Sequence, residues 1–518
     1  MTVATAARAA LALGAACLPL RALVAQPRTL ADTIGRFDAT VAAAAEAWNV
    51  PGLSIAVVRD GRVLFSKGYG VRQLGADAPV TDQTLFGIMS TTKAMTAVTL
   101  AMLVDEKRLR WSDPVAQWLP ELVFPAPLDA RTITVRELLT HNTGLGNADL
   151  LWARGDLPAA EIYRRVRFLT PAYTARAGFV YQNVMYGAAG LLIERITGKP
   201  YATVLQERIF TPLGMTRTRA TYGAVVAARD TNVSRAHYRI RDTVRVIAED
   251  TVDALPAAGA VWSTASDMAR WARFLLDSGR VDGKRLLSER GIAAIFAPHV
   301  IVPPAEFYPT TARTRPHWTT YGLGWFQQDF RGRMLQFHTG SLDGRTAIIG
   351  LVPDRNVGVV VLGNLDHAEV RHALMLQAID LFAGTNGEPA RDWSAELKAL
   401  YDGLARAADS TAASTAATRT METRPSLPLT RYAGRYEHPV WGMIDVTVDG
   451  DALIVQAGAG ASNRARMAHW QYDTFRGEFG DGRGGASTAR FTVDERGIAA
   501  TMTFFGSEGY TFRRVAMP

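Results

Sequence analysis

Apolar and polar positions repeat with different periods along the chain, and these periods predict which stretches form helices and which form strands. Residues 29 to about 48 follow a helical pattern. Two β-rich runs follow, residues 52–58 and 63–68, on either side of Asp60-Gly61. Because Asp-Gly between two such runs is a strong hairpin signal, we expect a helix followed by a β-hairpin.

The central part of the chain is mainly helical, and strand patterns return after it. Residues 113–254 combine helical patterns with long loops, and Thr134 with Glu137 three residues later has the spacing of a capping box. Apolar runs follow at residues 335–341, 347–352 and 357–362. Such runs are typical of buried antiparallel strands.

The last part of the chain changes character twice. Residues 393–408 have a helical pattern, and residues 409–428 form a Ser/Thr/Ala-rich stretch that ends in prolines, which is a linker by composition. From residue 432 to 515, short β-rich runs alternate with turns at Asp449-Gly450 and Arg496-Gly497. This spacing predicts an all-β barrel or sandwich.

Composition is ordinary for a globular protein and argues against several kinds of partner. The 518 residues are 48% hydrophobic and 20% charged, and the net charge of +8 is spread along the chain. Because no basic run is interleaved with aromatic residues, we expect no nucleic-acid partner. The nine histidines lack the pairing of a metal site, and residues 480–485 match G-x-G-x-x-G without its strand-to-helix context. We therefore expect no metal and no cofactor.

The first 25 residues have the pattern of an export signal. Arg8 precedes an apolar run over residues 9–20, and residues 23–25 offer a cleavage site before Gln26. The run is too short to span a bilayer, so we expect an exported protein, periplasmic or secreted, without a membrane span. Cys17, the only cysteine, follows a sequence with Gly where a lipoprotein signal has Leu, which disfavours a lipid anchor.

The strongest chemical signal is the spacing of Ser90 and Lys93, where a small-residue turn runs into a helical pattern. Three residues apart, the two side chains lie on the same helix face. Amides near the helix start can stabilise an oxyanion, and a lysine kept from solvent can accept the serine proton. Alternatively, Ser90 only caps the helix and Lys93 is solvated, and the spacing alone does not exclude this.

Two further motifs favour the catalytic interpretation. In chain order the three motifs are Ser90-Thr91-Thr92-Lys93, Tyr181-Gln182-Asn183 and His338-Thr339-Gly340. Together they resemble the signatures of the penicillin-recognising serine hydrolases, which include class C β-lactamases, D,D-carboxypeptidases, D-aminopeptidases and related esterases. The resemblance covers about residues 30–383. It implies an α/β serine β-lactamase-like fold, with an antiparallel sheet flanked by helices and a helical subdomain.

The resemblance also implies catalytic roles in an acyl-enzyme mechanism. Ser90 would be the nucleophile, and Lys93 its base or electrostatic partner. Tyr181 would carry a proton to the leaving group. The backbone amides of Ser90 and Ser341 would form the oxyanion hole.

Substrate binding would fall to Asn183 and to the third motif, His338, Thr339 and Gly340. Most class C β-lactamases have lysine where His338 stands, whereas His-Thr-Gly resembles certain D,D-carboxypeptidases and D-aminopeptidases. We therefore expect a serine hydrolase of one of those two types, acting on a peptide or small-molecule substrate. A β-lactamase or carboxylesterase on the same scaffold is the alternative, and a non-catalytic binding or assembly protein is a further one.

The C-terminal part resembles the lipocalin-like domain that is fused to some members of this family, through the segments at residues 432–439, 470–475 and 512–515. In those proteins the domain serves assembly and shields the active site, so we expect a homo-oligomer through this domain. The expected organisation is a signal peptide at residues 1–25, a β-lactamase-like hydrolase domain at 29–385, a helix and linker at 386–428, and a lipocalin-like β-barrel at 429–518.

Overall fold

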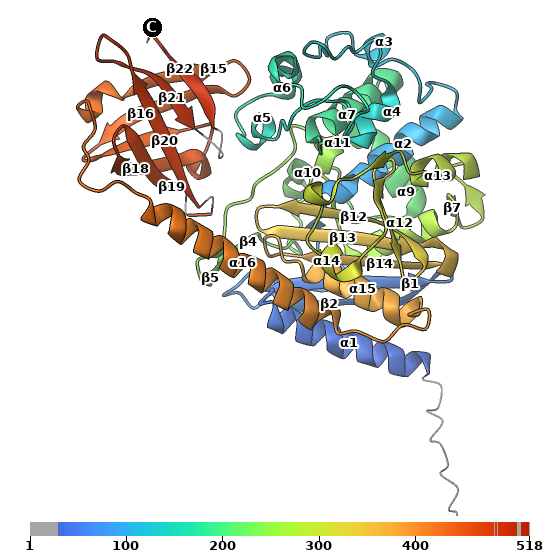
Figure 1. The fold of residues 1–518 in the computed structure, drawn as a ribbon. Helices are drawn as coiled ribbons and strands as arrows, with labels where there is room; N and C mark the ends of the chain where they lie inside the picture. Colours follow the sequence, from blue (N-terminus) through green and yellow to red (C-terminus); the bar gives the residue numbers. More distant parts are fainter. Residues whose placement is uncertain (1–28, 481, 484, 505–508, 517–518) are drawn as a thin grey trace, which may run out of the picture.

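A computed structural model describes residues 29–480, 482–483, 485–504 and 509–516 (Figure 1). It contains an eight-stranded antiparallel sheet flanked by helices, and a closed eight-stranded β-barrel. The expected signal peptide at residues 1–25 and Cys17 lie outside the described residues. In the part of the chain that the structure describes, no helix is long and apolar enough to cross a membrane.

The central sheet has the strand order β2-β1-β14-β13-β12-β11-β10-β9. Strand β14 pairs with β1 on one side and with β13 on the other, so the first hairpin of the chain joins the last strands of the sheet. The strands are β1 Gly52–Arg59, β2 Arg62–Gly70, β9 Val300–Ile301, β10 Thr319–Tyr321, β11 Phe326–Phe330, β12 Arg333–Leu342, β13 Arg345–Val352 and β14 Val357–Gly363. These pairings confirm the predicted hairpin and the predicted antiparallel strands.

Alternate residues of the central strands face two separate hydrophobic cores. In β1, Leu53, Ile55 and Val57 belong to one core, whereas Ala56 and Val58 belong to the other. Helices α1 (Leu30–Ala47), α15 (Val370–Phe382) and α16 (Trp393–Ala417) cover one face of the sheet (Figure 1). Helices α2 (Thr92–Asp105) and α12 (Ala265–Leu276) contribute to the core on the other face. Burial on both faces explains why the strands are continuous apolar runs.

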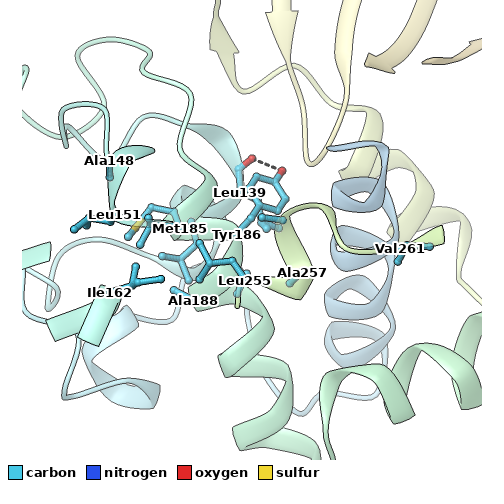
Figure 2. Close-up of a cluster of buried hydrophobic side chains, with 14 of the residues drawn as sticks. Leu139, Ala148, Leu151, Ile162, Met185, Tyr186, Ala188, Leu255, Ala257 and Val261 are labelled. Atoms are coloured by element: carbon cyan, nitrogen blue, oxygen red, sulfur yellow. Dashed lines mark hydrogen bonds between the residues drawn. The ribbon is translucent and has the colours of Figure 1, made fainter. Parts of the chain in front are cut away.

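A helical region lies on the α2 side of the sheet. Figure 2 shows Met185, Tyr186 and Ala188 of one helix packed with Leu139 and Ala257 of two others and with Leu255, which directly precedes the helix of Ala257. The Tyr186 hydroxyl donates a hydrogen bond of 2.7 Å to the Leu139 carbonyl. The helices of this region are α3 Val115–Trp118, α4 Val135–Thr140, α5 Leu150–Ala153, α6 Ala159–Arg165, α7 Asn183–Thr197, α8 Tyr201–Leu205, α9 Thr211–Leu213, α10 Tyr222–Ala227 and α11 Pro256–Gly259.

Short elements complete the part of the chain that precedes α15. They are α13 Glu289–Phe296, α14 Thr311–Thr314 and the strand pairs β3 Phe86–Gly87 with β6 Trp262–Ser263, β4 His237–Ile240 with β5 Thr243–Val246, and β7 Arg280–Val281 with β8 Lys284–Arg285. The predicted capping box is present at α4, where the Thr134 amide donates to the Glu137 carboxylate at 2.7 Å.

Helix α16 leads from the sheet to the barrel and is longer than its apolar pattern predicts. The pattern predicts a helix over residues 393–408, but the structure continues the helix to Ala417. The added residues are rich in alanine, which has the highest intrinsic helix propensity and needs no apolar face to stay helical. The first part of the expected linker is therefore helical.

The barrel is formed by eight consecutive antiparallel strands and closes through pairing of the first strand with the last. Tyr432, Tyr436, Phe475 and Phe491 stack edge to face in its interior. The strands are β15 Gly434–His438, β16 Gly442–Asp449, β17 Ala452–Gln456, β18 Arg464–Gln471, β19 Thr474–Phe479, β20 Ala486–Val493, β21 Ala499–Phe504 and β22 Tyr510–Val515. The predicted C-terminal β-barrel is confirmed, and its consecutive strand order is that of up-and-down barrels.

Candidate active site

Ser90 lies in a single 3₁₀ turn, Met89–Thr91, that leads directly into α2. Met89 has a φ of 46°, a left-handed conformation that is unusual for a residue other than glycine and often marks a functional turn. Lys93 lies in the first turn of α2, and its Nζ is 3.0 Å from Ser90 Oγ. The two side chains therefore meet as their spacing predicts.

Lys93 is completely buried, and its Nζ has two partners besides Ser90. Nζ donates to Asn183 Oδ1 and to the Ala258 carbonyl, both at 2.7 Å. Burial lowers the pKa of the Lys93 amine to about 7, against an opposing effect of the Asp149 carboxylate. A neutral amine has two N–H donors and one lone pair. Because the other two partners can only accept, the lone pair of neutral Lys93 faces the Ser90 hydroxyl.

Asp149 fixes the orientation of the Asn183 amide. One oxygen of the Asp149 carboxylate accepts from Asn183 Nδ2 and from the indole of Trp152, both at 2.9 Å. Since the Asn183 amino group is used by Asp149, the amide oxygen faces Lys93. Asn183 is the first residue of α7, and Asp149 directly precedes α5, so this contact joins two segments at the site.

Tyr181 is held next to Ser90 by the segment that ends α4. His141 has a φ of 60° at the end of that helix, and its ring packs 4.2 Å from the Tyr181 ring. His141 Nδ1 accepts the backbone amide of Gln182 at 2.9 Å, which fixes the chain next to Tyr181. Burial raises the pKa of the Tyr181 phenol well above its usual value, and a hydrogen bond to Ser90 opposes this. Tyr181 is therefore protonated near neutral pH.

The third motif lies on β12, where that strand extends past its partner β11. Pairing with β11 ends at Phe337, so the following residues face the Ser90 turn on that side. A Cβ on Gly340 would lie 2.3 Å from the Ile88 carbonyl oxygen and 3.1 Å from the Ser90 amide nitrogen. Only glycine permits this approach of the strand to the turn.

His338 lies behind the cleft rather than in it. Its ring is completely buried, with Nδ1 donating to the Thr339 carbonyl at 2.6 Å and Nε2 2.9 Å from the Tyr321 hydroxyl. Burial and the charge of Lys93 lower the pKa of His338 to about 3, so the ring is neutral. The predicted contact between this side chain and a substrate is not supported by this arrangement, because both nitrogens are used within the protein. Thr339 does line the cleft.

A cleft of about 630 Å³ opens over Ser90. It is lined mainly by apolar side chains, together with Tyr181, Asn183, Thr339 and Ser341. Three carboxylates line it, those of Asp149, Glu306 and Asp343, and Asp343 is paired with Arg483 at 3.2 Å. A hydrogen bond to Asp366 raises the pKa of His367, which also lines the cleft. Among the described lining residues there is no lysine or arginine, and His367 is the one histidine.

The structure brings together most of the residues that the motifs predict, and it adds others. Lys93, Tyr181 and Asn183 surround Ser90, and Gly340 packs against the turn that carries it. Asp149 carried no sequence signal, because it lies in a loop without a recognisable pattern. His141 lies outside the three motifs, and its aromatic contact with Tyr181 depends on the fold.

Comparisons with known proteins match this architecture. The family model described as Beta-lactamase matches residues 37–384, and a model described as a domain of unknown function (DUF3471) matches residues 418–515. Unguisins hydrolase ungD' of Aspergillus campestris is 30% identical over 427 residues, which cover 79% of this chain and 77% of that protein.

Two solved structures have a similar fold. The octameric penicillin-binding protein homologue from Pyrococcus abyssi has a TM-score of 0.61 at 22% identity, over 93% of this chain and all of that chain. A D-stereospecific amidohydrolase from Streptomyces has a TM-score of 0.53 at 24% identity, over 68% of this chain and 98% of that chain. At these identities the two structures support the fold alone.

Proposed function

The chain belongs to the beta-lactamase family, and on that premise we propose that it is a serine hydrolase that forms an acyl-enzyme on Ser90. The observation that carries the proposal is the environment of Lys93. Its Nζ lies 3.0 Å from Ser90 Oγ, and its other two partners can only accept hydrogen bonds. A lysine with a pKa of about 7 in this arrangement can accept the serine proton at neutral pH.

The reaction proceeds in two proton-balanced stages. Neutral Lys93 takes the Ser90 proton while Ser90 Oγ attacks the substrate carbonyl, and the backbone amides of Ser90 and Ser341 bind the resulting oxyanion. The intermediate collapses when the Tyr181 hydroxyl, which is hydrogen-bonded to Ser90, protonates the leaving group. The proton that Lys93 took from Ser90 then restores the Tyr181 hydroxyl. In the second stage water attacks the ester on Ser90, neutral Lys93 takes a proton from that water, and Lys93 returns the proton to Ser90 Oγ as the acid is released.

The charge of the cleft favours a substrate with a free amino group over one with a carboxylate. Asp149, Glu306 and Asp343 line the cleft, and Asp343 is paired with Arg483 at 3.2 Å. The described lining residues include no lysine or arginine. His338 is neutral and buried, so it supplies no cation for a carboxylate. We therefore favour an aminopeptidase or amidase on small peptides with D-residues over a D,D-carboxypeptidase or a β-lactamase. A carboxylesterase is the second candidate, because the apolar part of the cleft suits an ester.

We propose export and self-association as further properties. Export rests on the pattern of residues 1–25. Self-association through the barrel rests on the resemblance of that domain, and a solved relative from Pyrococcus abyssi is described as octameric. A monomer in light scattering would contradict the assembly proposal.

A substrate panel tests the proposed activity. Wild type and Ser90→Ala are incubated with a short D-alanyl peptide amide, its N-acetylated form, a penicillin and a short-chain ester, and consumption is followed by mass spectrometry. We expect the wild type to consume the free-amine peptide faster than the acetylated one, and Ser90→Ala to consume neither. Preferential loss of the penicillin would contradict the substrate assignment, and equal turnover by Ser90→Ala would contradict the nucleophile.

A further inference from the structure

We propose that Arg371, held by Glu369, positions and polarises the peptide unit that supplies the Ser341 amide to the oxyanion hole. This inference rests on the proposed function. Arg371 lies in the first turn of α15, outside the three motifs, and its side chain is completely buried. It contacts no cleft space itself, so it is a positioning residue.

The contact that carries the inference is between Arg371 and the end of β12. Arg371 Nη1 donates to the Gly340 carbonyl and to Ser341 Oγ, each at 2.6 Å. The Gly340 carbonyl and the Ser341 N–H belong to the same planar peptide unit. A charged donor on the carbonyl therefore fixes the direction of that N–H and makes it a stronger donor.

The other side of the guanidinium is held by a carboxylate. Glu369 accepts from Arg371 Nη2 at 2.7 Å and from Nε at 3.3 Å, and it also accepts from His372 Nδ1 at 2.5 Å. Burial alone would raise the pKa of Glu369, but Arg371 and His372 lower it to about 2, so the pair is ionised. The rigid, planar guanidinium thus binds Gly340 and Ser341 through Nη1 and Glu369 through Nη2 and Nε, which a lysine cannot reproduce.

The same guanidinium supports the neighbouring cleft wall. Its carbon lies 5.3 Å from the ring centroid of Tyr308, and the Tyr308 hydroxyl is 2.9 Å from Thr339 Oγ1. Gly340 in turn packs against the Ser90 amide. Arg371 therefore contacts the strand next to the Ser341 amide, through the Gly340 carbonyl, and the cleft wall, through the Tyr308 ring. The close packing of Gly340 against the turn sets the distance between this strand and Ser90.

The test compares an ester with its thionoester, in which sulfur replaces the carbonyl oxygen. Sulfur is a weak hydrogen-bond acceptor. The kcat/KM of the ester divided by the kcat/KM of the thionoester therefore reports on the strength of the oxyanion donors. We expect Arg371→Lys to lower this ratio ~10-fold or more, approaching the ~10²–10³-fold loss typical of one missing donor. The matched control is Arg331→Lys. Arg331 forms a buried ion pair at 2.7 Å with Asp380, which lies on α15 as Arg371 does, and this pair is away from the cleft. We therefore expect Arg331→Lys to keep the wild-type ratio.

A second variant covers the case in which Arg371→Lys does not fold. Replacing both partners, Glu369→Leu with Arg371→Leu, leaves no buried charge unpaired and is the change that buried ion pairs tolerate best. We expect this protein to fold and to show the lowered ratio. A wild-type ratio in a folded variant that lacks Arg371, with both substrates slowed equally, would overturn the inference.

Titration of Ser90 with a serine-directed phosphonate separates this inference from the proposed function. If the wild type takes up no label, the proposed function fails and the inference fails with it. If the wild type and the Arg371 variants are labelled but the ester-to-thionoester ratio is the same, only the inference about Arg371 is overturned.

Discussion

A single buried amine sets the chemistry that this site can perform. Lys93 is surrounded by Ser90, Asn183 and the Ala258 carbonyl, and two of these partners leave its lone pair directed at the serine. The contact between the Ser90 and Lys93 side chains could be predicted from the sequence, because residues three apart lie on the same face of a helical turn. The orientation of Asn183 could not, because it depends on Asp149, whose loop is brought to α7 only by the fold.

The pH dependence of the reaction tests the role of Lys93 at this scale. The reactive form is the neutral amine, so kcat/KM should fall as the pH drops through about 7. Asp149 stabilises the charged form, and Asp149→Asn keeps an acceptor for Asn183 while removing that charge. We therefore expect the acidic limb of the profile to move to lower pH. The control is Asp129→Asn, which removes a carboxylate bonded to Arg131 at the surface. An acidic limb that stays in place, or moves to higher pH, would contradict the assignment of Lys93 as base.

At the scale of elements, the site depends on how closely β12 approaches the turn before α2. The strands, the hairpin and the capping box could be predicted from hydrophobic periodicity and local signals. The approach itself could not, because it brings together residues 88–90 and 340, which are distant in sequence. The end of α16 could not be predicted either, because an alanine-rich helix without an apolar face has no periodic signal.

Substitution of Gly340 tests this approach. In Gly340→Ala the new methyl group would lie 2.3 Å from the Ile88 carbonyl oxygen, so strand and turn must separate. Because displacements of about 1 Å at a reacting centre can cost ~10²-fold, we expect a loss of that size in kcat. Gly350→Ala on β13 is the control, since its methyl group would meet the flexible Met375 side chain, and its activity should be close to wild type. Comparable kcat values for the two variants, both folded, would be evidence against a required close approach.

At the scale of the whole molecule, the barrel contacts the segment that carries Asp149. Arg154, directly after α5, is buried and donates from Nη2 to the Met443 carbonyl of the barrel at 3.0 Å. The Arg154 carbonyl accepts from Asn463 of the barrel at 3.0 Å. Trp152 and Ala153 of α5 line the cleft. The barrel therefore supports one wall of the cleft, a relation that could not be predicted from either segment alone.

Loss of the Arg154 side chain tests this support. We expect Arg154→Ala to raise KM several-fold with a smaller change in kcat, because the wall moves while the Ser90 turn stays in place. The lost hydrogen bonds to a charged group should also lower the free energy of unfolding by ~1.5–3 kcal/mol. Arg131→Ala, at an exposed pair, is the control for both quantities. An unchanged KM in the Arg154 variant, measured beside its unfolding curve, would show that the barrel does not shape the cleft.

The most direct test of the whole account is to find the covalent bond on Ser90. Wild type and Ser90→Ala are mixed with the D-alanyl peptide amide or with the phosphonate, quenched in acid and digested, and the peptides are mapped by mass spectrometry. We predict an added mass on the peptide that contains Ser90 in the wild type, located at that residue, and none in Ser90→Ala. No adduct in the wild type, or an adduct at another residue, would contradict the proposed mechanism and favour a binding or assembly role for this fold.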